Sequence, residues 1–180
     1  TEDNKIWLPN IVKRSFRDPD GITVDDGQRI LRLLHKSGLV KLQDLATSNI
    51  ANDLIADGKL IKTNILSAPK SSEILNNIDE NWSRVAEHNR LPFVSYPHEW
   101  PAEMLYSAGN LTLELAEAFL EEGYGLKDAT PYNIIFKGAN PLFVDVLSIE
   151  KRQPLDSIWR AEAQFIRNFI LPLLCWKKFG

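Results

Sequence analysis

Three polar residues in the second half of the chain have the types and the spacing that suit phosphoryl transfer. Asp128 is followed five positions later by Asn133, and Asp145 stands at the end of a short apolar run. A loop carboxylate can orient an attacking hydroxyl or accept its proton. An amide oxygen and a second carboxylate are hard oxygen ligands, which Mg²⁺ prefers. The spacing therefore predicts Asp128 at a catalytic-base position and Asn133 and Asp145 as metal ligands.

Each of these residues also has a structural interpretation. Asp128 could cap a turn, Asn133 could hold a turn backbone, and Asp145 could cap the end of a strand. Any one of them alone is more often structural. Together, at this spacing, they favour a functional site over three separate structural roles.

The segment around the three residues predicts a hairpin. Residues 133–136 and 141–146 alternate as strands, and residues 137–140 contain the glycine expected in a tight turn. The hairpin would bring Asn133 and Asp145 to one end of the same two strands. Both residues would then face a common loop region.

The rest of the chain predicts an α+β fold, with a small N-terminal sheet plus one helix followed by a helical lobe that carries the hairpin. Apolar residues recur at helical spacing in the long helices, and Asp-Gly pairs mark turns. The expected elements are, in order, strands within 14–35, a helix over 37–58, a strand over 59–66, a connector over 67–77, a strand over 90–101, a helix over 102–122, the hairpin, and a helix over 156–176 that is interrupted near Pro172.

Two lobes are expected from this order. Residues 1–90 would form the small N-terminal lobe, and residues 91–180 the helical lobe with a catalytic-loop-like segment at 126–147. The apolar segment Phe169–Trp176 predicts an interface, and we expect the natural protein to continue beyond residue 180.

Composition excludes several classes of function. The chain of 180 residues has a formal net charge of −3, so nucleic-acid binding has no electrostatic support. A single cysteine, Cys175, excludes a disulfide framework and a cysteine-based metal site, and we expect it to be a buried thiol. The longest apolar run, Phe169–Trp176, is far shorter than the ~20 residues that span a bilayer. A cytoplasmic protein that does not bind membranes is expected.

The segments "KDATPYNIIF" and "PLFVDV" resemble the catalytic and metal-binding loops of the protein-kinase-like superfamily, closest to its aminoglycoside and choline phosphotransferase branch. The resemblance implies a kinase-like fold that uses Mg²⁺ and ATP. Arg32 and Lys62 are then candidate phosphate contacts. Tyr96 and Trp100, in the segment "YPHEW", are candidate contacts to the nucleotide base near a hinge.

The sequence also departs from the kinase pattern. Leu126 stands where kinase loops carry a histidine, and Val146-Leu147 follow the metal-binding aspartate position. The segment "RDPDGIT" holds one glycine, so a glycine-rich phosphate loop is missing, and the helix expected at 37–58 holds no glutamate to pair with a lysine. These departures predict that phosphoryl transfer has degenerated.

A second resemblance covers residues ~14–176 of the chain. The segments "FRDPDG", "LIADGKLI", "LPFVSYPHEWP" and "FVDVLSIE" are similar to the N-terminal region of a bacterial family of S-adenosylmethionine-dependent methyltransferase-like proteins, some of them nodulation-related. In that family a methyltransferase domain follows this region. This chain has no glycine-rich methyltransferase fingerprint, so S-adenosylmethionine would bind only through a domain that the chain does not contain.

Three functions follow as hypotheses. The first is a degenerate kinase-like accessory domain of a methyltransferase-like protein, which binds a nucleotide, a substrate or a partner. The second is an active Mg²⁺–ATP-dependent phosphotransferase that acts on a small molecule. The third is a purely structural interaction domain. In each case the expected partner is the protein's own C-terminal methyltransferase domain or a second copy, contacted through Phe169–Trp176.

Overall fold

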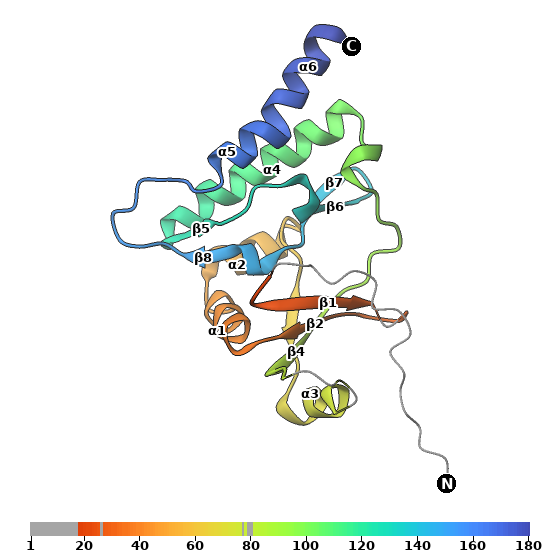
Figure 1. Cartoon of the computed structure of the whole chain (residues 1–180), viewed down its shortest axis with the longest axis vertical. Helices are drawn as coiled ribbons and strands as arrows, with labels where there is room; N and C mark the ends of the chain where they lie inside the picture. The colour runs from red at the N-terminus through yellow and green to blue at the C-terminus, as the bar shows by residue number, and fades with distance from the viewer. Residues whose placement is uncertain (1–17, 26, 77, 79–80) are drawn as a thin grey trace. The chain divides into compact units, whose positions relative to one another are not determined.

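The computed structural model describes residues 18–25, 27–76, 78 and 81–180. These residues form a mixed α+β structure with a four-stranded antiparallel sheet, two two-stranded ribbons and several helices (Figure 1). The α+β class expected from the sequence is confirmed. The expected strand at residues 14–17 and residue 26 of the expected turn lie outside the described residues.

The described residues divide into two compact units. The first contains the described residues up to Asp44 together with Lys62–Arg90, and the second contains Leu45–Ile61 and Leu91–Gly180. The N-terminal lobe expected over residues 1–90 includes 45–61, whereas in the structure these residues group with the second unit.

The first unit is built on a sheet with the strand order β1-β2-β4-β3. Its strands are β1 (Gly21–Asp25), β2 (Ile30–Leu34), β3 (Thr63–Ile65) and β4 (Arg84–His88), and all neighbouring strands are antiparallel. The tight turn predicted near 25–27 is present: Gly27 has φ +86° and its N–H donates to Asp25 Oδ1 at 2.8 Å. The segment 30–34, which the sequence left open between strand and helix, is a strand.

One face of this sheet is covered by helix α3 (Ala68–Leu75). Ile74 and Leu75 of α3 pack against a cluster of buried strand residues, which contains Val24, Leu31, Leu33 and Val85. The sequence analysis predicted a connector at 67–77, and this was wrong. Burial of the two apolar residues stabilises a helix that is only eight residues long.

Helix α1 (Lys36–Leu45) packs closely on the turn that precedes β1. The carbonyl of Asp20 accepts from His35 N at 3.0 Å, and Lys41 Nζ donates to the Asp20 carboxylate at 2.7 Å. A Cβ built on Gly38 would lie 2.2 Å from the same carbonyl oxygen. Glycine at position 38 therefore permits this backbone approach.

The single helix expected at 37–58 is two helices, α1 and α2 (Asn49–Ala56). Ser48 is the N-cap of α2 and marks where the second helix begins. Its Oγ accepts from Ala51 N at 2.9 Å. Glu122, the C-cap residue of helix α4 (Ala102–Glu121), also accepts from Asn49 N at 3.1 Å, and its hydrogen bond with Ser48 lowers the pKa of its carboxyl. Within the second unit, these bonds hold the start of α2 against the end of α4.

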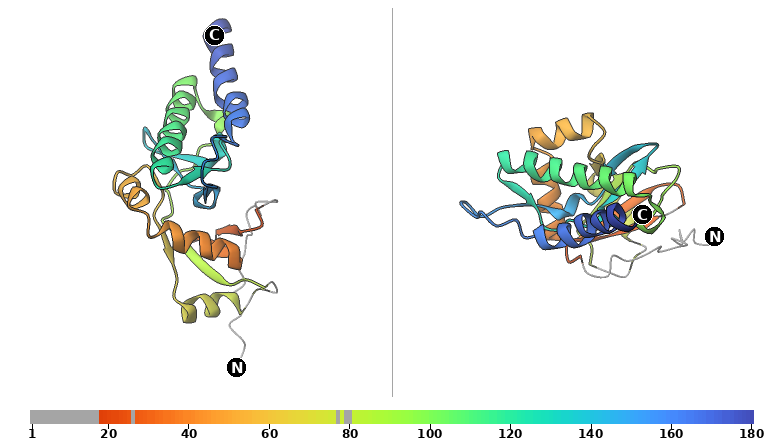
Figure 2. Two further views of the ribbon diagram at one scale, coloured as in Figure 1. Left: turned by 90° about the vertical axis from the view of Figure 1, so that its left-hand side faces the viewer. Right: turned by 90° about the horizontal axis from the view of Figure 1, so that it is seen from above.

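The second unit is built around helix α4 (Ala102–Glu121), which the sequence predicted almost to the residue. Its inner face buries Ala108, Leu111, Leu115 and Phe119. Figure 2 shows α4 running alongside the C-terminal helical segment. That segment is continuous and consists of α5 (Glu162–Phe165), a π-helical turn over Ile166–Ile170, and α6 (Leu171–Phe179).

Two short antiparallel ribbons complete the second unit. Strands β6 (Ile134–Lys137) and β7 (Asn140–Phe143) form the predicted hairpin, in which Gly138 takes φ +64°. Strands β5 (Tyr124–Leu126) and β8 (Ile149–Lys151) form the other ribbon. The strand predicted over 90–101 is not present, because 91–96 has no regular structure and Pro97–Glu99 is a 3₁₀ turn.

Candidate functional site

The three residues singled out in the sequence lie on two loops next to the β6–β7 hairpin. Asp128 follows β5, and Asn133 is the last residue of the 3₁₀ turn Pro131–Asn133, directly before β6. Asp145 comes two residues after β7. Because β6 and β7 are antiparallel, with Ile134 opposite Phe143, the hairpin holds Asn133 and Asp145 at its same end.

Hydrogen bonds connect these two loops. The side-chain Nδ2 of Asn133 donates to the backbone carbonyl of Asp128 at 3.5 Å. The backbone N–H of Val144 donates to the carbonyl of Asn133 at 2.8 Å. Asn133 is 7% exposed and therefore sits between the two segments that carry the aspartates. The structure brings Asn133 together with Asp128 directly, and with the residue preceding Asp145.

Backbone contacts fix both loops to the surrounding structure. Lys127 N donates to the carbonyl of Ser148 at 2.9 Å, next to Asp128. Ser148 in turn donates to the carbonyl of Asp145, from its N–H at 3.0 Å and from its Oγ at 2.8 Å. Ala129 N donates to Gln164 Oε1 at 2.6 Å, which anchors the other side of the loop to α5. The loops are held by several bonds at each end.

Ser148 and Gln164 are supporting residues that the sequence reasoning missed. Ser148 is fully buried, and a serine three residues after a strand-end aspartate could have been recognised as a residue that bonds back to a turn. Gln164 lies 35 residues beyond Ala129. No local pattern could have shown that contact.

The sequence also allowed purely structural roles for these residues, as turn-holding or capping side chains. The structure bears on these roles for Asn133 and Asp145. Asn133 does hold a turn through its bond to Asp128, as a purely structural asparagine would. Asp145 stands at the N-cap of the 3₁₀ turn Val146–Ser148, but its side chain makes no capping hydrogen bond there. Capping of this 3₁₀ turn therefore does not account for a carboxylate at position 145.

The side chains of Asn133 and Asp145 carry oxygen atoms of the kind that Mg²⁺ prefers. The hydrogen bond to Asp128 uses the amide nitrogen of Asn133, so the amide oxygen, which is the candidate ligand atom, is not engaged in it. Among the described residues there is no cluster of three His, Cys, Asp or Glu side chains that could enclose a metal ion. Mg²⁺ commonly takes one or two protein ligands together with waters and phosphate oxygens, which matches one amide and one carboxylate.

The candidate base contacts Tyr96 and Trp100 differ in their surroundings. Tyr96 is 42% exposed, and its ring stacks on His98 with centroids 5.8 Å apart. Trp100 packs edge-on against Phe136 of β6 at 5.0 Å, and its Nε1 donates to Ser95 Oγ at 2.9 Å. Trp100 thus fixes the 91–101 segment to the hairpin that also carries Asn133.

The candidate phosphate contacts Arg32 and Lys62 lie in the first unit. Arg32 is a buried residue of β2 and pairs with Ala86 of β4. Lys62 is exposed and directly precedes β3. Asp128, Asn133 and Asp145 lie in the second unit, so the predicted phosphate contacts belong to a different unit from these three residues.

A buried histidine lies on the same sheet as Arg32. His88 is 4% exposed, and its Nδ1 lies 3.2 Å from Thr63 Oγ1. Within the described part of the chain its Nε2 has no hydrogen-bond partner. Burial, together with the positive charge of Arg32, lowers the pKa of His88 from 6.5 to about 3. His88 is therefore neutral at physiological pH.

Sequence comparison relates the chain to one curated protein. The chain is similar to nodulation protein NoeA of Rhizobium meliloti (strain 1021). The two are 31% identical over 166 residues, which is 92% of this chain and 33% of NoeA. The chain thus spans about a third of the length of that relative. No protein-family model matches the chain.

The region similar to NoeA, at 92% of the chain, takes in at least part of both compact units. Among the described residues, no helix is long and apolar enough to cross a membrane. The apolar C-terminal segment differs from expectation in one respect: Cys175, expected to be buried, is exposed on α6. Phe169 is fully buried, whereas Leu171, Leu174 and Trp176 are each at least half exposed.

Proposed function

We propose that this chain is a degenerate kinase-like domain that binds a Mg²⁺–nucleotide without efficient phosphoryl transfer, as an accessory part of a nodulation-related, methyltransferase-like protein. The observation that carries the proposal is the position of Asn133. Its side chain bonds to Asp128, and its carbonyl bonds to the residue before Asp145. Degenerate here means that the metal-binding residues are kept and the catalytic surroundings are lost.

In this proposal the roles of the three residues are distinct. Asn133 would hold Mg²⁺ through its amide oxygen and Asp145 through its carboxylate, and the ion would supply positive charge that neutralises the phosphates of the nucleotide. Asp128 lies where a base would orient an acceptor hydroxyl. The bonds from Lys127 to Ser148 and from Ala129 to Gln164 hold the loop in place before the ligand arrives.

The surroundings of Asp128, Asn133 and Asp145 lack two features that efficient phosphoryl transfer needs. Leu126, in place of the usual histidine, is a buried strand residue of β5 and is 2% exposed, so it contributes packing and no proton chemistry. The connection between β1 and β2 holds one glycine, Gly27, and cannot form a glycine-rich phosphate loop. A nucleotide would bind, but its γ-phosphate would be poorly oriented.

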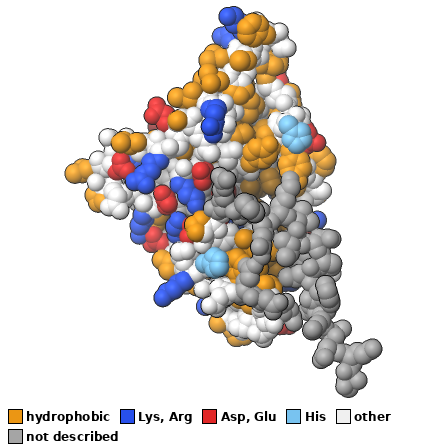
Figure 3. Space-filling model, viewed as in Figure 1, with side chains coloured by type: hydrophobic (Ala, Val, Ile, Leu, Met, Phe, Trp, Pro, Cys, Tyr) orange, Lys and Arg blue, Asp and Glu red, His pale blue; other side chains and the backbone are white. Residues whose placement is uncertain are grey.

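The wider role of the domain is taken from the relative. NoeA is named a nodulation protein, and we extend that role to this chain because the similarity covers 92% of it. The methyltransferase activity, and with it S-adenosylmethionine, is assigned to a region outside this chain. We assign the exposed apolar residues of α6 to a contact with that region or with a second copy (Figure 3).

A thermal-shift panel tests the proposal on the purified chain. The ligands are Mg²⁺–ATP, Mg²⁺–GTP, Mg²⁺ alone and S-adenosylmethionine. A ligand at a hundred times its Kd stabilises the folded state by about 2.7 kcal/mol, which is a measurable shift. The proposal predicts a response to a Mg²⁺–nucleotide and none to S-adenosylmethionine. An unchanged melting temperature with every ligand would favour the purely structural role.

A turnover assay separates the degenerate domain from an active phosphotransferase. The chain is incubated with Mg²⁺–ATP and a set of hydroxylated small molecules, and ADP release is followed. We expect ADP release no faster than the spontaneous rate. Release that depends on an acceptor and is abolished by Asp128→Asn would show an active enzyme and contradict degeneracy.

A further inference from the structure

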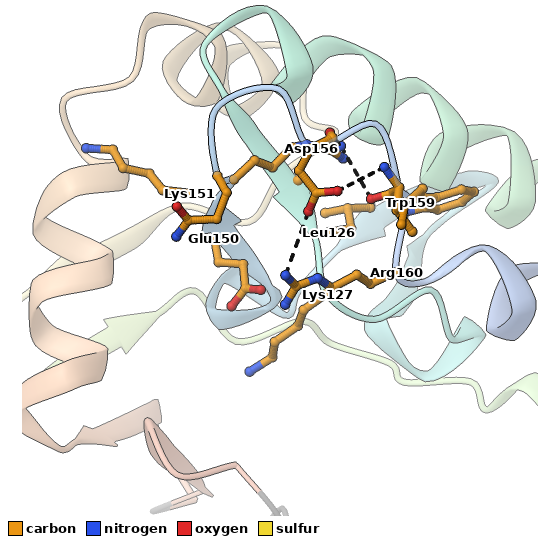
Figure 4. A pocket seen from close by; sticks show the side chains of 11 residues that line it. Leu126, Lys127, Glu150, Lys151, Asp156, Trp159 and Arg160 are labelled. Carbon is orange, nitrogen blue, oxygen red and sulfur yellow. Dashed lines mark hydrogen bonds and ion pairs between the residues drawn. The ribbon is translucent and has the colours of Figure 1, made fainter.

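A small pocket lies in the second unit, on the β5–β8 ribbon and the segment that follows it (Figure 4). Its volume is about 200 Å³. Because a water molecule occupies roughly 30 Å³ of liquid, this space suits a small ion or a small organic group. Asp128, Asn133 and Asp145 are not among the lining residues, so the pocket is separate from the Mg²⁺ site.

Charged side chains dominate the lining of this pocket. Four are basic and two are acidic, which gives the pocket a formal excess of two positive charges, although the whole chain has a net charge of −3. The charged lining residues are Lys127, Glu150, Lys151, Arg152, Asp156 and Arg160. A dianion would balance the excess.

Arg152 forms a fixed wall of the pocket. Its guanidinium donates to the carbonyls of Asp156 and, at 3.3 Å, of Ile158. Its backbone N–H donates to the carbonyl of Gly123 at 2.9 Å. A Cβ built on Gly125 would lie 3.1 Å from Arg152 Cδ, so glycine at that position leaves room for the side chain. The wall is therefore preformed.

Arg160 is the charged donor that is least committed to the protein. Its guanidinium lies 3.7 Å from the Asp156 carboxylate, and its side chain is 69% exposed. Asp156 already accepts from Ile158 N at 3.0 Å. A long, exposed ion pair of this kind contributes little to stability, so a bound anion can compete for Arg160 at small cost. The planar guanidinium matches two oxygens of a phosphate.

Lys127 connects the pocket with the candidate site along the chain. It lines the pocket and directly precedes Asp128, and its backbone N–H is fixed by Ser148 at 2.9 Å. The lysine side chain contributes a second positive charge to the lining. Phosphate monoesters carry about −1.5 to −2 charges at neutral pH, which fits the excess charge of the lining.

We propose that this pocket binds a small phosphate-type dianion through Arg160 and Lys127. The anion is either free inorganic phosphate or the phosphate group of a small phosphomonoester. The site goes beyond the Mg²⁺–nucleotide site, because its residues and its ligand differ from those of the Asn133–Asp145 pair.

An amide NMR titration of the whole chain tests the proposal, with inorganic phosphate and glycerol phosphate as probes in separate arms. We expect saturable shifts centred on the amides of Lys127, Lys151 and Arg160. Glycerol phosphate binding more tightly than inorganic phosphate would indicate a phosphomonoester, and the reverse order would indicate free phosphate. Sodium chloride at equal ionic strength should give no saturable shift.

Matched variants complete the test. Arg160→Gln and Lys127→Gln should each weaken binding about tenfold or more, as expected for loss of a hydrogen bond to a charged group. Lys137→Gln removes the same charge at the exposed hairpin turn and should leave affinity unchanged. Asp145→Ala should also leave it unchanged, which separates this site from the Mg²⁺ site. Shifts that do not saturate, or equal weakening by Lys137→Gln, would overturn the proposal.

Discussion

The backbone N–H of Val144 donates to the carbonyl of Asn133 at 2.8 Å, just beyond the end of the β6–β7 hairpin. This bond extends the pairing of the two strands by one step. It holds Asp145 next to the segment in which Asn133 reaches back to Asp128. Three residues spread over 18 positions of the sequence are thereby held in one loop cluster.

Replacing Asn133 should destabilise the second unit even without a ligand. Asn133→Ala removes the bond from Nδ2 to the Asp128 carbonyl in a site that is 7% exposed. The expected loss is about 1 kcal/mol in the free energy of unfolding, measured by urea denaturation. Tyr132→Ala, at the neighbouring position, is 64% exposed and should change stability by less than about 0.5 kcal/mol. Equal losses in both variants would contradict a specific role for the amide.

The stability of the first unit should fall on acidification because of His88. Its pKa is about 3 in the folded chain, against 6.5 when unfolded, so below pH 6.5 the unfolded state binds more protons. The stabilisation from neutral His88 is complete above pH 6.5 and is lost progressively as the pH falls towards 3. His88→Gln should flatten this part of the pH profile of the unfolding free energy.

His98 provides the control for that profile. It is exposed and stacks on Tyr96 in the second unit. His98→Gln should leave the slope between pH 6.5 and pH 3 unchanged. A slope that survives His88→Gln, or that disappears with His98→Gln, would show that burial of His88 is not its cause.

Gly38→Ala should destabilise the first unit although alanine favours helices. The intrinsic gain in helix α1 is about 1 kcal/mol. The new Cβ would meet the Asp20 carbonyl oxygen at 2.2 Å, and that carbonyl is held by His35 N. We expect a net loss of about 2 kcal/mol or more in the unfolding free energy, in the range of overpacked sites. Ser37→Ala, exposed in the same turn, should be neutral or slightly stabilising; a stabilising Gly38→Ala would contradict the close approach.

The isolated chain should associate through α6 at high concentration. Leu174 and Trp176 are 55% and 54% exposed on this helix, and no α6 residue is buried. Leu174→Glu should shift sedimentation towards the monomer. Val40→Glu introduces the same charge at an exposed site of α1 and should have no effect. A wild-type chain that stays monomeric at millimolar concentration would contradict contact between copies.

The sequence predicted the elements whose signals are local. Helix α4 has a long apolar stripe, and the β6–β7 hairpin has a glycine turn between alternating strands. The structure confirms both elements. Each could be predicted because the residues within the element determine its conformation. The order of Asp128, Asn133 and Asp145 around that hairpin followed from the same local pattern.

The elements that the sequence missed depend on distant contacts. Strand β4 contains Arg84 and His88 among its five residues and has little strand signal, yet it pairs with β2 on one side and β3 on the other. Helix α3 forms because Ile74 and Leu75 find an apolar sheet face. The break before α2 has a local signal in the N-cap Ser48, and Glu122, 73 residues away from Asn49, adds a second acceptor that no local pattern shows.

The Mg²⁺-dependent affinity of the chain for ATP, compared between wild type and Asp145→Ala, tests the central claim most directly. Isothermal titration calorimetry with and without Mg²⁺ gives the two dissociation constants. Glu117→Ala removes the same charge at an exposed position of α4 and serves as the control. We predict Mg²⁺-dependent binding that Asp145→Ala weakens at least tenfold and Glu117→Ala leaves unchanged. Binding that is absent, or equal in wild type and Asp145→Ala, would show that Asn133 and Asp145 do not form a nucleotide site.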